Sequence, residues 1–471
     1  MNEDQYFNDP EFKELLSSYE QSQQTGEHLF IDAEDLADIA DYYYQSERYD
    51  EAALAIQRAA ELDPNALAVL NYQIHEALAA DDITTAEQLL SRIMERESPE
   101  YIYNRAEILI AQNRVDEADA FLRQCLNDVE PDELQDYVLD VANIYTDYNL
   151  NDKALEWMMR AKPDNTDDFK ELMARTLFGL GKYEDSERLF NELIDRDPFQ
   201  KRYWNALASA QYMNEDFSAS VTSSEYAIAI DPGDPDAVIS KANALFRLDN
   251  YEEALSYYER YSRLVPDDEF GLLHQGSCLL NLGRYEESAA RLHAALLTAP
   301  DDSEYRVEIL QELAFANSEM HRPDEAIRYL DLTDELDCDH TDMLVIRGHI
   351  LLANDRLNEA EQMFKLAMQE SGDSPHVMMR ILVSLYDNKY TEASYAMFRK
   401  FFTIVDEDWN EGYAYMALCC WDTKRYDEFL SYLDKACRKN PHEARLVLSS
   451  LFPAELPVSR YCEYMTEKLK Q

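Results

Sequence analysis

The chain has 471 residues, of which 95 are acidic and 43 are basic, so its formal net charge at pH 7 is −52. A field of this sign repels nucleic acid and anionic lipid surfaces, which excludes nucleic acid as a general partner and favours basic, neutral or locally matched proteins. The chain holds only 10 Gly and 15 Pro and is rich in Ala, Leu, Glu and Tyr, which is typical of an all-α protein.

The first 32 residues are predicted to form a helical leader. Asp9 and Pro10 can start a helix. Its apolar residues recur at helical spacing, at Phe12, Leu15, Leu16 and Tyr19. The segment lacks the basic and then apolar regions of a secretory leader, and no run of about 18 apolar residues occurs in the chain. These features predict a soluble cytoplasmic protein with no membrane insertion.

Residues 33–443 repeat a pattern with a period near 34 residues. Its marker is a small residue that follows each predicted turn. The marker stands at Ala52, Ala86, Ala118, Ala154, Ser186, Ser220, Ala254, Ser288, Ala326, Ala360 and Ala393, with Phe429 in the last unit. The regular spacing predicts one supersecondary unit copied about twelve times.

Each unit is predicted to be a pair of amphipathic helices. The stretch GLGKYEDSERLFNELIDRDP, residues 179–198, has a turn, an aromatic residue, two acids, a small residue and a closing proline, and residues 281–300 repeat this order. Small residues let two helices approach closely. The matching small positions on the first helices are Ala40, Ala208, Ala242, Gly276 and Gly348. One pair leaves an apolar face uncovered, so the pairs must stack.

The last segment, residues 444–471, is predicted to form capping helices. Tyr461, Met465 and Leu469 make an apolar stripe at helical spacing. A terminal unit needs an altered outer face for solubility, so both end segments are interpreted as caps. The alternative is that one of them docks in the groove of the repeats.

Known chemistry-bearing motifs are absent from the sequence. There is no phosphate-binding glycine loop, no nucleophile elbow and no zinc-protease motif. Asp406, Asp408 and Asn410 alternate as in a calcium loop, but Ala417 stands where the bidentate Glu is required. The seven cysteines form no CxxC pair, and the adjacent Cys419 and Cys420 are interpreted as packed thiols. We expect no enzyme, no cofactor and no metal.

The order of residues within a unit resembles the tetratricopeptide repeat. Trp204, Leu207 and Ala208 stand where the family favours Trp, Leu and Gly, and a second unit carries Gly276 and Tyr285 at the expected places. Asn151 and Pro323 depart from the pattern, because each replaces the aromatic residue. The resemblance implies a right-handed superhelical solenoid of about twelve helix pairs, whose first helices line a concave groove.

The resemblance also implies which side chains face that groove. In the central units these are Arg175, Arg202, Asn205, Ser209, Tyr212, Met213, Asn243, Phe246, Arg247, Ser277 and Asn281. One interpretation is a polar surface that is merely solvated. The other is a ladder of Ser and Asn groups for an extended backbone, with arginines that pair with carboxylates of the guest.

Toward the carboxyl end the corresponding places become apolar. They hold Leu352, Met378, Leu382, Leu385, Leu418 and Trp421. Such a surface would suit an amphipathic helix, a second copy of the chain or its own tail. Packing within the repeats themselves is the alternative.

Without catalytic motifs, function is expected to lie in the stacked surface. The sequence favours a noncatalytic scaffold that binds a segment of another protein, extended or helical, with self-association possible. The alternative is a regulatory sensor that binds a small ligand or peptide inside the superhelix. An enzyme ranks third, since repeats and caps leave no catalytic domain.

The charge gives a direct test. At about 0.15 M salt, where surface fields decay within about 8 Å, the protein should show no measurable binding to duplex DNA. A gel shift at low micromolar protein would overturn the electrostatic argument.

Overall fold

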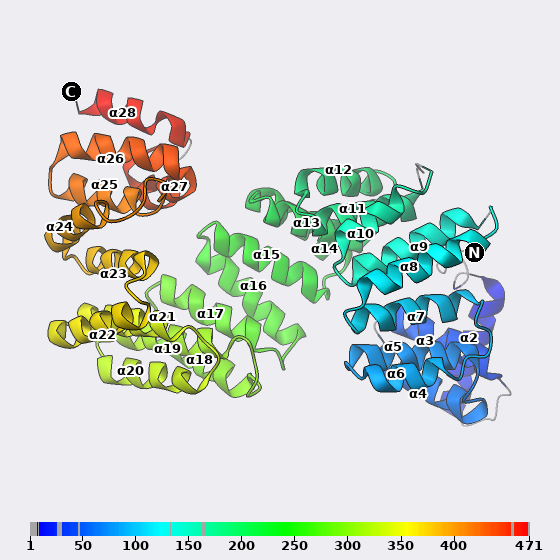
Figure 1. Ribbon diagram of the computed structural model, residues 1–471. Coiled ribbons are helices and arrows are strands. Elements are labelled where there is room, and N and C mark those ends of the chain that lie inside the picture. The colour runs from blue at the N-terminus through cyan, green and yellow to red at the C-terminus, as the bar shows by residue number, and fades with distance from the viewer. Residues whose placement is uncertain are drawn as a thin grey trace. The chain divides into compact units, whose positions relative to one another are not determined.

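The computed structural model describes residue 7 and residues 9–25, 31–45, 48–131, 133–162, 166–453 and 456–469. Every regular element in these ranges is a helix, and they contain no strand (Figure 1). The chain divides into two compact units, Met1–Glu215 and Asp216–Gln471. None of the described helices is long and apolar enough to cross a membrane.

The first unit contains the helices up to α13. They are α2 (Pro10–Thr25), α3 (Ala33–Gln45), α4 (Tyr49–Leu62), α5 (Leu67–Ala79), α6 (Ile83–Leu90), α7 (Pro99–Ala111), α8 (Val115–Cys125), α9 (Leu134–Asp147), α10 (Asn151–Met158), α11 (Asp167–Gly179), α12 (Tyr183–Ile194) and α13 (Lys201–Met213). Five packed pairs run from α3/α4 to α11/α12.

The second unit begins with α14. Its α-helices are α14 (Phe217–Ile230), α15 (Pro235–Arg247), α16 (Tyr251–Leu264), α17 (Glu269–Asn281), α18 (Tyr285–Thr298), α19 (Arg306–Glu319), α20 (Pro323–Asp331), α21 (His340–Ala353), α22 (Leu357–Glu370), α23 (Pro375–Asp387), α24 (Thr391–Phe401), α25 (Tyr413–Asp422), α26 (Tyr426–Lys439), α27 (Pro441–Leu448) and α28 (Tyr461–Lys468). Six packed pairs run from α15/α16 to α25/α26. The predicted all-α repeat of helix pairs is confirmed.

The turn inside each pair repeats as regularly as the side chains do. One residue with positive φ stands two positions before the second helix. These residues are Asp81, Asn113, Asn149, Gly181, Glu215, Asp249, Gly283, His321, Asp355, Lys389 and Lys424. The next amide closes the turn: Lys182 N donates to Leu177 O at 2.9 Å, and Arg284 N donates to Leu279 O at 2.8 Å.

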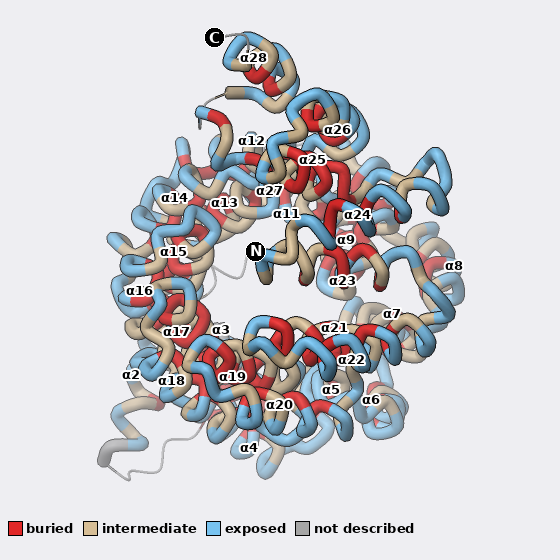
Figure 2. The backbone as a smooth tube through the Cα atoms, turned by 90° about the vertical axis from the view of Figure 1, so that its left-hand side faces the viewer, coloured by how far each residue is buried: buried red, intermediate tan, exposed pale blue. Residues whose placement is uncertain are grey.

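The predicted small residues form the close contact between the two helices of a pair. Ala254 and Ser288 are fully buried. The Ser186 hydroxyl donates to Ala174 O at 2.9 Å and the Ser288 hydroxyl donates to Gly276 O at 2.8 Å, in each case twelve residues back on the first helix. Figure 2 shows buried and exposed residues alternating along the helices, as expected where one face is packed.

The marker of the eleventh unit was predicted one residue too early. Ala393 is exposed, whereas Ser394 is fully buried. The Ser394 hydroxyl donates to Leu382 O at 3.0 Å, which is the same twelve-residue contact. The turn residue Lys389 also stands five positions before Ser394, as Gly283 does before Ser288. The true register of this unit therefore lies one residue later than the sequence suggested.

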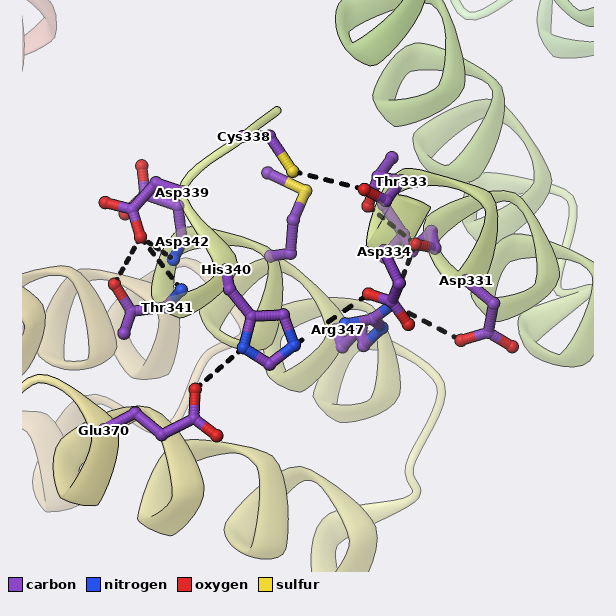
Figure 3. Close-up of polar contacts among 12 residues, drawn as sticks. Asp331, Thr333, Asp334, Cys338, Asp339, His340, Thr341, Asp342, Arg347 and Glu370 are labelled. Atoms are coloured by element: carbon purple, nitrogen blue, oxygen red, sulfur yellow. Dashed lines mark hydrogen bonds and ion pairs between the residues drawn. The ribbon is translucent and has the colours of Figure 1, made fainter. Parts of the chain in front are cut away.

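Successive pairs are tied together by a polar residue just before the small position of the first helix. Lys241 Nζ donates to Glu225 at 2.7 Å, and Gln275 Nε2 donates to Tyr258 O at 3.2 Å. Arg347, 5% exposed, donates through Nη2 to Leu330 O at 2.8 Å, and Figure 3 shows it facing the end of the preceding pair. Each contact joins a first helix to the second helix of the pair before it.

Helices at both ends pack on the neighbouring repeat. Phe12 and Tyr19 of α2 are buried in one cluster with Ile39 of α3. Tyr461 and Met465 of α28 are buried in the core that α25 and α26 share. Both predicted end helices exist, and the domain boundaries at residues 33 and 443 stay predictions.

The close contact predicts the effect of a larger side chain. A Cβ added to Gly348 would lie 2.2 Å from Cε1 of Phe364, so Gly348→Val should lower the urea midpoint, with a loss of about 2 to 3 kcal/mol from overpacking. Gly233→Val is the control, because the nearest atom to its Cβ lies 3.4 Å away in an exposed turn. Equal midpoints for the two variants would contradict this contact.

Candidate functional site

The predicted arginines of the first unit already have carboxylate partners. Arg175 on α11 donates to Asp147 Oδ1 at 2.6 Å and to Asn143 Oδ1 at 3.0 Å. Arg202 on α13 lies 3.1 Å from a Glu171 carboxylate oxygen. Each guanidinium is thus paired with the preceding first helix. A carboxylate of a guest would have to displace these partners.

Two predicted residues of the first unit do meet at one cleft. Arg175 and Ser209 border a cavity of about 350 Å³, together with Phe178 and Phe190. The Ser209 hydroxyl donates to Asn205 O at 3.1 Å along its own helix. Tyr212 is half-buried one turn further on.

The predicted polar residues of the second unit are largely occupied by contacts within the chain. Asn243 accepts from the Tyr258 hydroxyl at 2.8 Å, and the Arg247 guanidinium lies 4.7 Å from the Phe217 ring centre. Phe246 packs against Tyr251 with 5.3 Å between the rings.

Ser277, which was expected to belong to the row of Ser and Asn groups that binds an extended backbone, is buried. Ser277 is 6% exposed, and its hydroxyl donates to Leu273 O at 3.3 Å within the same helix. Asn281 donates to Ser277 O at 2.8 Å. Because Ser209 and Ser277 both donate to their own helices, they do not present an open row of donors to a guest.

The predicted apolar surface near the carboxyl end also needs correction. Leu382 is fully buried, because the one-residue shift puts it at the small position that faces α24. Leu385, Leu418 and Trp421 are half-buried and pack against the same core. Trp421 contacts Phe429 with 5.1 Å between the rings. Leu382 is therefore interior, whereas Leu352, Met378 and Leu385 of the predicted set line a pocket of about 600 Å³.

The corrected register brings Val383 and Asp387 to the outward side of α23, after the buried Met379. Met379, Val383 and Asp387 now follow each other at one-turn spacing and line a pocket of about 620 Å³. The rest of its lining comes from α19, α21, α25, α27 and the turns before them. These residues are Phe315, Val345, Ile346, His349, Glu411, Tyr415, Asn440, His442, Glu443, Leu446 and Val447, and Arg380 and Ser384 of α23 complete the lining. The lining combines apolar side chains with the carboxylates of Asp387, Glu411 and Glu443.

The adjacent thiols of Cys419 and Cys420 on α25 are packed in the core. Cys419 and Cys420 are fully buried, and burial raises their pKa values to about 11 and about 12. In the described ranges no three His, Cys, Asp or Glu side chains are grouped closely enough to hold a metal.

Buried carboxylates on first helices were not foreseen from the sequence. Burial raises the pKa of Glu312 on α19 to about 7, and the neighbouring Glu308 adds to the rise. Within the described residues its Oε2 has no hydrogen-bond partner. In the first unit, burial raises the pKa of Glu107 to about 7 in the same way.

Family models of the tetratricopeptide repeat match residues 172–235, 225–269 and 239–304, and a further one matches residues 36–66 and 99–127. These ranges coincide with helix pairs that share the small-residue contact. The chain is a tetratricopeptide repeat protein. Such repeats typically mediate protein–protein interactions. No curated protein matches the chain.

Solved structures of other proteins match different shares of this chain. Yeast Tom70 is 12% identical with a TM-score of 0.43, and the match covers 93% of this chain and 96% of that one. The APC/C hetero-tetramer Cut9-Hcn1 is 15% identical with a TM-score of 0.37, over 79% and 73% of the two chains. A thermophilic repeat protein of Thermus thermophilus is 22% identical with a TM-score of 0.32, over 40% and 100%.

The raised pKa of Glu312 predicts how the stability of the fold changes with pH. Its pKa rises from 4.5 to about 7 on folding, so the folded state holds a proton that the unfolded state releases, and stability falls as pH rises through this window. Glu312→Gln removes this loss and should stabilise the protein by about 1 to 3 kcal/mol at pH 8, with little effect at pH 5.

The measurement is urea unfolding at both pH values. Glu286→Gln is the control, because Glu286 is exposed on α18, and its effect should stay within about 0.5 kcal/mol. A gain from Glu312→Gln that is equal at both pH values would contradict the assignment.

Proposed function

We propose that this tetratricopeptide repeat protein is a noncatalytic scaffold that holds a segment of another protein against the exposed faces of its first helices. The observation that carries the proposal is the pocket of about 620 Å³ in the second unit. Its lining combines apolar side chains, which can bury side chains of a guest, with polar groups that can orient one.

The pocket favours a chain segment over a compact small ligand. Its lining is contributed by five first-position helices, α19, α21, α23, α25 and α27, from Phe315 to Val447. A guest must be extended or helical to contact all of them at once. The alternative function, a sensor for a small ligand or peptide, is supported chiefly by the smaller cleft at Arg175 and Ser209.

The net charge and the free thiols support the proposed class of partner and the proposed location. A net charge of −52 disfavours nucleic acid and anionic membranes as partners. The cysteines are free, which accords with a reducing compartment, and we infer a cytoplasmic location. Self-association stays one of the partner choices.

The test uses a photo-crosslinking amino acid in the full chain. At Val383, which lines the pocket, it should crosslink one continuous segment of a partner protein in cells. At Leu297, which is 88% exposed on the second helix α18, it should not crosslink that segment. Equal crosslinking from both positions, or none from Val383, would contradict the proposal.

A second arm separates the two candidate grooves. Arg175→Ala combined with Arg247→Ala should leave the Val383 crosslink unchanged, because both arginines lie outside the pocket lining. A loss of the crosslink in this variant would return the binding site to the central repeats. A small molecule retained by the purified chain in native mass spectrometry would instead favour the sensor.

A further inference from the structure

We propose that the pocket lined by α19 to α27 takes an apolar segment with a basic side chain, whose cationic group is held at Asp387. This inference rests on the proposed function and adds the chemistry of the guest.

Carboxylates outnumber available cations in the pocket. Asp387, Glu411 and Glu443 line it, and the guanidinium in the lining, that of Arg380, forms an ion pair with Asp342. Burial lowers the pKa of His349 below its usual value, so this ring is neutral at pH 7. The local field is therefore negative and complements a positively charged group.

Two of the three carboxylates already serve the chain itself. Both oxygens of Glu443 accept from the Gly412 amide at 3.0 Å, which ties α27 to the start of α25. Glu411 lies 3.4 Å from the His376 ring nitrogen. Both carboxylates therefore already have partners within the chain.

Asp387 is the carboxylate that remains for a partner. In the described part of the chain, no hydrogen bond or salt bridge to its oxygens is found. Desolvation by the surrounding protein raises the pKa of Asp387, and the charge of Lys389 lowers it, as a protonated His349 would. An ammonium or guanidinium group at this exposed carboxylate could form a charge-assisted hydrogen bond, which is stronger than a neutral one.

The apolar residues that line the pocket with Asp387 favour apolar side chains in the rest of the guest. Val383 lies one turn before it on α23, and Ile346 and Tyr415 line the pocket from the neighbouring first helices. Leu446 of α27 is 66% exposed at the same pocket. Apolar side chains flanking the basic one would therefore be buried, and a purely polar basic tail would gain only the weaker, salt-screened attraction.

The experiment selects peptides without assuming their sequence. A library of short random peptides is selected on the full chain, with counter-selection on Val383→Arg, which fills the pocket and adds a positive charge. The recovered peptides should be enriched in Lys or Arg flanked by apolar residues and depleted in Asp and Glu. Circular dichroism checks that Val383→Arg keeps its helices.

The affinity of the recovered peptides is then measured on two charge-matched variants. Asp387→Asn should weaken binding by about tenfold or more, because it removes the charge-assisted contact. Asp427→Asn, an exposed position on the second helix α26, should change binding less than about twofold, which measures the general effect of net charge. Equal binding to wild type and Asp387→Asn would overturn the inference.

The outcomes also separate this inference from the proposed function. Neutral or acidic peptides that still lose binding on Val383→Arg would contradict the cationic anchor and leave segment binding in place. Recovery of no peptide that depends on Val383 would contradict both.

Discussion

The close contact between the two helices of each pair is the constraint on which the rest of this molecule depends. Where the marker is Ser, as at Ser186, Ser288 and Ser394, its hydroxyl donates to the carbonyl twelve residues earlier. Where the first helix carries Gly348, the Phe364 ring fills the space that a Cβ would need. This contact fixes the rotation of both helices about their axes, so it also decides which residues are left on the exposed face.

The second constraint is the stacking of one pair on the next. Lys241, Gln275 and Arg347 hold equivalent places, and each donates to the second helix of the preceding pair. At Arg347 that helix is short and continues as the 3-10 turn Leu332–Glu335, where Asp334 accepts at 2.7 Å (Figure 3). A buried cation is retained there because the carboxylate and carbonyl oxygens replace its water.

Electrostatics inside the second unit follow from these two constraints. The chain has a net charge of −52, and stacking places some carboxylates, such as Glu312, in half-buried positions where burial raises their pKa. The arginines expected to bind an acidic guest are instead paired, as Arg175 is with Asp147. The guest proposed for the pocket of the second unit therefore carries the opposite charge to the one that the arginines of the sequence suggested.

The sequence by itself determined the all-α class, the helix pairs and nearly every small contact, because these follow from local periodicity and turn residues repeated along the chain. Which residues of a helix face outward depends on the rotation of that helix about its axis. A shift of one residue in register turns the outward face by about 100°. The expected marker, Ala393, lies one residue before the true one, Ser394. The sequence therefore predicted Leu382 in the groove, although it is buried, and did not predict Val383 and Asp387 in the pocket lining. The ion pair of Arg175 with Asp147 joins residues that are 28 positions apart in the chain. The raised pKa of Glu312 comes from burial by the surrounding helices. Both depend on contacts between helices, so only the tertiary structure decided them.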